Sequence, residues 1–132
     1  MTILYVSHGH PQFSKGGGEI AAWRLFEAFQ SEIGHENSGF LAASFREDAF
    51  TSGCEVKSMS HNQWIVCGST NPVLHSSAIN CCQDGALYQA LQNLPVQLIH
   101  AHHYLHIGID ILLSLKKWFP QAKLVLTLHD YW

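Results

Sequence analysis

The chain has 132 residues, close to the commonest size of a single domain, and its 47% hydrophobic content is enough for one packed core. Its formal net charge of -3 and charged fraction of 13% leave no basic field that would hold a nucleic-acid backbone. We therefore expect one domain that does not take nucleic acid as a partner.

The first predicted elements are a buried strand, a glycine loop and an amphipathic helix. Residues 3–6 form a continuous apolar run of strand formers followed by turn residues, which is typical of a strand covered on both faces. After the loop at residues 14–19, apolar side chains recur at helical spacing and so share one helix face: Ala22, Leu25, Phe26, Phe29 and Ile33. Gly34 follows where glycine commonly ends a helix, because it adopts the left-handed conformation at little steric cost.

The middle of the sequence gives weaker signals. Residues 40–43 and 55–59 predict two short strands. Residues 60–83 mix small polar residues, glycine, proline, histidine and cysteine with scattered large apolar side chains, and we interpret them as an irregular insertion. Within this segment, Trp64, Ile65 and Val66 fit either a core contact or a lipid-facing patch, and its role stays open.

Regular elements return in the last third of the chain. Residues 85–93 predict a helix that stops before Pro95, and residues 97–101 predict a strand. The next helix has apolar positions from Ile107 to Trp118, with Lys116 and Lys117 at its end, where cations suit the helix dipole. Residues 123–128 predict a last, buried strand.

Strands that alternate with helices in this way predict an α/β fold, a doubly wound, Rossmann-like and mostly parallel sheet with helices on both faces. The sequence stops at Trp132, directly after the last predicted strand. We therefore expect the domain of residues 1–132 to be truncated and to belong to a longer protein.

No segment has the length and composition of a membrane-spanning helix. The longest apolar stretch, residues 107–115, falls short of the roughly 20 residues that a bilayer requires. Residues 1–6 do not contain the basic segment of a secretory signal. The four cysteines contain no C-x-x-C pair, which fits free thiols in a reducing compartment. We expect a cytoplasmic protein.

Gly16, Gly17 and Gly18 stand between the first strand and the first helix. Without Cβ atoms, their backbone N–H groups can approach a ligand closely, and the helix amino terminus adds partial positive charge. This arrangement favours an anion such as a phosphate or diphosphate, although the glycines alone would also fit a tight turn. Lys15 precedes the glycines, so the loop is not the P-loop of nucleotide triphosphatases.

Seven of the ten histidines lie at or just after the carboxyl ends of three predicted strands: His8, His10, His100, His102, His103, His106 and His129. The ligand crevice of an open α/β sheet lies at that edge. Imidazole can carry a proton, donate a hydrogen bond or bind a metal. The cluster of His100, His102 and His103 therefore leaves a metal-dependent hydrolase open, while for most single histidines a structural role is the simpler interpretation.

Both ends of the chain resemble the amino-terminal domain of the family 4 retaining glycosyltransferases, which adopt the GT-B architecture. Residues 3–7 and the sequence from Gly16 to Glu19 are similar to the family's first strand and glycine loop. Residues 98–102 and 125–130 resemble two further strands with terminal histidines. Residues 44–84 do not take part in the resemblance.

The resemblance implies an enzyme that moves a hexose from a nucleotide sugar to a glycan, lipid or small-molecule acceptor with retention. This chain would be its acceptor-side half, inactive alone, and the carboxyl-terminal nucleotide-sugar domain is absent from the sequence. No metal or other cofactor is implied, and peripheral association with the inner face of a membrane is compatible with such an acceptor. A noncatalytic binding module of the same fold is the remaining alternative.

The resemblance also assigns roles to residues. Gly16, Gly17 and Gly18 would face the donor diphosphate, where amides and a helix dipole stabilise the charge that develops on the leaving group. His129 would lie beside the transferred sugar and is the candidate catalytic residue. Four further residues are candidate acceptor-side contacts: His102, His103, Asp130 and Tyr131.

Overall fold

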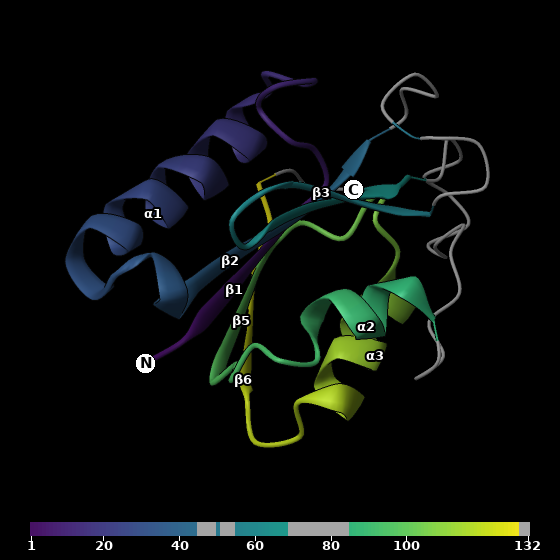
Figure 1. Ribbon diagram of the computed structural model, residues 1–132. Coiled ribbons are helices and arrows are strands. Elements are labelled where there is room, and N and C mark those ends of the chain that lie inside the picture. The colour runs from purple at the N-terminus through teal and green to yellow at the C-terminus, as the bar shows by residue number, and fades with distance from the viewer. Residues whose placement is uncertain (45–49, 51–54, 69–84, 130–132) are drawn as a thin grey trace.

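The computed structural model describes residues 1–44, 50, 55–68 and 85–129, which contain six strands, three α-helices and one short 3-10 helix (Figure 1). In chain order these elements are β1 (Ile3–Ser7), α1 (Gly17–Ile33), the 3-10 helix η1 (His35–Asn37), β2 (Ser38–Ser44), β3 (Val56–Ser60), β4 (Gln63–Cys67), α2 (Ala86–Leu91), β5 (Leu98–His102), α3 (Ile109–Trp118) and β6 (Lys123–Thr127). Among the helices described, none is both long enough and apolar enough to cross a membrane.

The strands form one six-stranded sheet in the order β3-β4-β2-β1-β5-β6. Every neighbouring pair is parallel except β3 and β4, which are antiparallel. The predicted mostly parallel α/β sheet is therefore confirmed. Ser7 of β1 is in register with His102 of β5, and His102 with Thr127 of β6, so the segments that follow these three strands leave the sheet at one edge.

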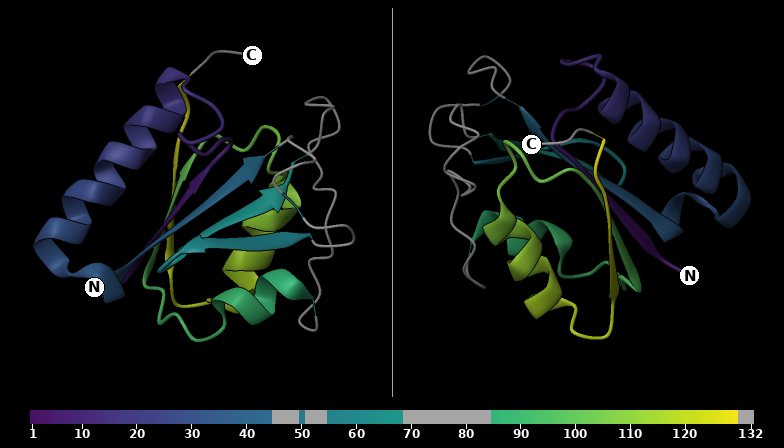
Figure 2. Two further views of the ribbon diagram at one scale, coloured as in Figure 1. Left: turned by 45° about the horizontal axis from the view of Figure 1, so that its top comes forward. Right: turned by 180° about the vertical axis from the view of Figure 1, so that it is seen from behind.

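Helices cover both faces of the sheet, as Figure 2 shows from two sides. Ile3, Tyr5 and Phe40 pack against Phe26 of α1 on one face, and Leu4 and its same-face neighbours pack against α2 and α3 on the other. Successive residues of a strand point to opposite faces, so a strand covered on both sides must be apolar throughout. This explains the continuous apolar run of β1, whose five residues are all buried.

The segment predicted to be irregular contains a regular strand. Residues 63–67 form β4, which pairs with β2 and β3, and Trp64, Ile65 and Val66 are 8%, 0% and 0% exposed. The irregular interpretation was wrong for these residues, and they belong to the core instead of a lipid-facing patch. The turn before β4 uses Asn62 at a φ of 54°, a conformation that asparagine tolerates better than most residues. Residues 69–83 of the predicted insertion lie outside the described residues.

The last strand forms where expected, but its burial was predicted wrongly. Leu124, Val125 and Leu126 of β6 are 40%, 45% and 44% exposed. These side chains are exposed because β6 is the outer strand of the sheet and pairs with β5 alone among the described strands. An apolar run alone does not distinguish a central strand from an outer one.

Candidate functional site

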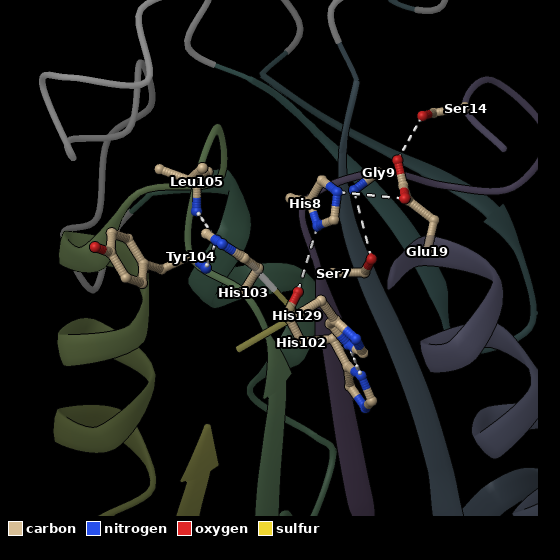
Figure 3. A network of polar contacts seen from close by, with 10 residues as sticks. All are labelled: Ser7, His8, Gly9, Ser14, Glu19, His102, His103, Tyr104, Leu105 and His129. Carbon is tan, nitrogen blue, oxygen red and sulfur yellow. Dashed lines mark hydrogen bonds and ion pairs between the residues drawn. The ribbon is translucent and has the colours of Figure 1, made fainter. Parts of the chain in front are cut away.

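A pocket of about 530 Å³ opens at the carboxyl edge of the sheet, beside the amino terminus of α1. Its lining consists of His8, Gly16, Gly17, Gly18, Glu19 and His129. The parallel order of β1, β5 and β6 brings the glycine loop and His129 together from opposite ends of the sequence. Figure 3 shows the polar contacts around this pocket.

The side chain of Glu19 packs against the glycine loop at Gly16. Gly16 is the N-cap residue of α1, and the Glu19 side chain reaches back toward the backbone amides of Gly16 and Glu19 itself, where its carboxylate atoms would meet any Cβ atom on Gly16. The Ser14 hydroxyl donates to the Glu19 carboxylate, at 2.5 Å (Figure 3). Burial alone would raise the pKa of Glu19, but these donors and the nearby His8 outweigh burial and hold the pKa below its usual value.

The position of Glu19 reduces the number of glycine-loop amides that are available to bind an anion. The amide of Gly16, which the sequence suggested for diphosphate binding, faces Glu19 instead. The amides of Gly17 and Gly18 lie in the first turn of α1 and have no carbonyl partner within the helix. They carry the partial positive charge of the helix terminus, so an anion in the pocket would bind to these two.

Gly17 and Gly18 are glycines for different reasons. A Cβ atom on Gly17 would meet nothing within 4 Å. A Cβ atom on Gly18 would lie 3.0 Å from Cε1 of His8 and 3.3 Å from Cδ2 of His129. Gly18 therefore lets two imidazole rings pack against the helix start, whereas a Cβ atom on Gly17 would point into open space.

His8 links the glycine loop to the neighbouring strand. Its Nε2 lies 3.3 Å from Oε2 of Glu19, and its Nδ1 lies 3.4 Å from the backbone oxygen of His102 (Figure 3). Each ring nitrogen of His8 therefore lies within reach of an oxygen acceptor, one on the glycine loop side and one on β5. The sequence placed His8 and Glu19 beside the loop without assigning either a role. The capping pattern of an acidic residue in the first helical turn is the signal for Glu19.

The rings of His100 and His102 on β5 and of His129 after β6 lie next to one another. The ring centroids of His100 and His102 are 4.2 Å apart, and those of His102 and His129 are 5.3 Å apart with nearly parallel planes. Burial, and then the charges of His100, His129 and His8, lowers the pKa of His102 to about 4. Burial, and then the charge of His129, lowers the pKa of His100 as well. His102 is therefore neutral at pH 7.

The two candidate acceptor-side residues that the structure describes, His102 and His103, do not line the pocket. His102 is 2% exposed and lies beneath His129, to which it is hydrogen-bonded. His103 is also 2% exposed, and its Nδ1 accepts hydrogen bonds from the amides of Tyr104 and Leu105. Asp130 and Tyr131 lie outside the described residues.

The predicted cluster of three histidines does not converge on one centre. Nε2 of His100 lies 2.9 Å from the Thr127 hydroxyl. His102 instead contacts His129, and His103 accepts from the amide of Tyr104. Within the part of the chain that the structure describes, no group of three or more His, Cys, Asp or Glu side chains is arranged to hold a metal ion.

The pocket combines two first-turn amides, a histidine with acceptors at both nitrogens and an exposed histidine, His129. Chemically, this set can hold an anion and donate a hydrogen bond to an oxygen beside it. No family model, no curated protein and no solved structure matches the chain.

Protein stability is expected to fall as the pH drops from 6.5 toward 4. The pKa of His102 is about 4 in the folded chain against an ordinary value of 6.5, so in this window the unfolded chain binds the extra proton. The stabilisation is present above pH 6.5 and is lost as the pH falls through the folded pKa, on the order of 3 kcal/mol in all. His100 and His10, whose pKa values are also lowered by burial, act in the same direction.

The measurement is the free energy of unfolding in urea, taken at intervals between about pH 7 and pH 4. His102→Phe is expected to flatten the pH dependence, while replacing the exposed His61 with glutamine is expected to leave it unchanged. An equally steep dependence in His102→Phe would contradict the assignment.

Proposed function

We propose that this chain is the acceptor-side half of a retaining glycosyltransferase of GT-B architecture, and that its pocket faces the donor diphosphate. The observation that carries the proposal is that the glycine loop and His129 line one pocket. These are the two segments on which the resemblance to family 4 rests, and they lie at opposite ends of the sequence. The parallel sheet with its ligand edge at the carboxyl ends of β1 and β6 supports the same assignment.

In the proposed reaction, the bond between the sugar's anomeric carbon and the diphosphate oxygen breaks, the acceptor hydroxyl oxygen bonds to that carbon with retained configuration, and the hydroxyl proton passes to the departing diphosphate. Negative charge develops on the departing diphosphate. The amides of Gly17 and Gly18, together with the amino terminus of α1, would stabilise this charge. His8 lies beside them, with its Nε2 3.3 Å from Oε2 of the buried Glu19 carboxylate.

His129 is the proposed catalytic residue because it is exposed at the pocket wall, next to Gly18. A hydrogen bond from His129 to the sugar or the acceptor would orient the reacting groups. In a GT-B enzyme a second domain binds the nucleotide and closes over the cleft, so this half supplies part of the site.

The proposal predicts that the 132-residue chain binds inorganic pyrophosphate by itself, though weakly, because only one wall of the cleft is present. Isothermal titration calorimetry should give saturable binding with a dissociation constant on the order of 1 mM, about −4 kcal/mol. Added sodium chloride should weaken the binding, because salt screens the charges of a partly exposed site. Absence of saturable heat at low salt would contradict the assignment of the pocket to a diphosphate.

A further inference from the structure

We propose that His102 is a positioning residue that fixes the tautomer of His129, so that His129 keeps its proton on Nδ1 and offers that N–H as a donor in the pocket. The role of the donor toward a substrate oxygen rests on the proposed function. The tautomer itself is a property of the unliganded chain.

The contact between the two rings requires one donor and one acceptor. Nδ1 of His102 and Nε2 of His129 are 3.0 Å apart, within hydrogen-bonding distance, and the ring planes are inclined by only 18° (Figure 3). A neutral imidazole has one N–H and one bare nitrogen. Either His102 donates from Nδ1 to Nε2 of His129, or His129 donates in the opposite direction.

Burial of His102 decides between these two arrangements. The residue is 2% exposed, and its Nε2 has no hydrogen-bond partner among the described residues. A proton on Nε2 would bury an N–H without an acceptor, which folded proteins rarely tolerate. A proton on Nδ1 instead meets an acceptor, Nε2 of His129, at 3.0 Å. The lowered pKa of His102 keeps the ring neutral, as this assignment requires.

The donor at Nδ1 of His102 determines the tautomer of His129. Since its Nε2 accepts from His102, the proton of a neutral His129 must be on Nδ1. Nδ1 has no partner among the described residues, and the exposed ring lines the pocket. His129 therefore presents a fixed donor to a hydroxyl or phosphate oxygen, and its Nε2 is not free to accept a proton as a general base. His102 acts on the ligand only through this ring.

The test is an imidazole ¹⁵N–¹H correlation spectrum of the 132-residue chain near neutral pH, in which the nitrogen shifts and coupling patterns identify each tautomer. Both His102 and His129 are expected to carry the proton on Nδ1. His102→Phe keeps an aromatic ring but removes the donor, and it should shift His129 toward the Nε2–H tautomer that free imidazole side chains prefer. His102→Asn keeps an amide N–H near the position of Nδ1 and should restore Nδ1–H on His129.

Two controls make the outcome specific. His100→Phe alters a ring whose centroid lies 4.2 Å from that of His102 but whose Nε2 contacts Thr127, so it should leave the tautomer of His129 unchanged. An Nε2–H tautomer of His129 in the parent chain, or Nδ1–H retained in His102→Phe, would overturn the proposal. If the Phe variant does not fold, the parent spectrum still decides the assignment. Failure of pyrophosphate to bind would remove the proposed function, but it would leave these tautomers as measured.

Discussion

Replacing Gly17 with tryptophan is expected to abolish pyrophosphate binding while the domain stays folded. The Cβ atom at this position points into open space, so the indole would not displace any protein atom within 4 Å of that Cβ. Because Gly17 lines the pocket, we expect the indole to obstruct access to the two amides proposed to hold the anion. We expect the dissociation constant to rise at least about 100-fold, equivalent to about 2.7 kcal/mol, by calorimetry.

Two variants control for effects of the substitution itself. Gly17→Ala adds one methyl group in open space at a helical position, so it should bind nearly as the parent does and unfold at slightly higher temperature. Ala28→Trp places the same indole on the exposed side of α1, away from the pocket, and should leave binding unchanged. Normal pyrophosphate binding by a folded Gly17→Trp protein would show that the glycine loop does not hold the anion.

Replacing His129 with alanine is expected to lower the turnover number for sugar transfer by about 100-fold or more, the usual scale for loss of one hydrogen-bond donor in an active site. The assay uses the polypeptide that carries this domain together with the proposed nucleotide-sugar domain, with nucleoside-diphosphate hexoses as donors. Because the donor is proposed to act in the transition state, kcat should fall much more than KM changes.

The matched variant for this experiment is His129→Asn, whose side-chain amide N–H lies close to the position of Nδ1. It should recover part of the lost turnover, whereas His61→Ala, at an exposed turn between β3 and β4, should have no effect. Turnover in His129→Ala equal to that of the parent would remove His129 from the proposed mechanism.

Local pattern was sufficient for most of the fold. The apolar run of β1, the helical spacing of Ala22, Phe26 and Phe29, and Gly34 predicted a strand and a helix that the structure confirms. Gly34 has a φ of 91°, which explains why the helix ends at a glycine. These features are encoded by neighbouring residues, so no knowledge of the tertiary structure is needed to recognise them.

Features that depend on the pairing of distant strands could not be predicted from the local sequence. β4 lies in a segment of mixed composition, and it is a strand because β2 and β3 pair with its two edges. Likewise, β6 has the composition of a central strand, and its exposure follows from its place in the sheet order. Strand order depends on contacts between segments far apart in sequence, which composition does not report.

For the candidate site, too, the sequence predicted some contacts and not others. Strand ends predicted that the glycine loop and His129 would share one edge of the sheet, and they line one pocket. The spacing of His100 and His102 places both on one face of β5, but it does not reveal that His129 covers His102. Nor does it show that Glu19 turns back onto the amide of Gly16, because that contact depends on the conformation of the loop.

The most direct test of the proposed anion site is a backbone ¹H–¹⁵N spectrum of the 132-residue chain during titration with inorganic pyrophosphate. The amides of Gly17 and Gly18 should show the largest shift changes, with smaller changes at His8 and His129 and one common dissociation constant. Saturable binding that leaves Gly17 and Gly18 unchanged, and instead shifts amides around Lys116 and Lys123, would contradict the assignment.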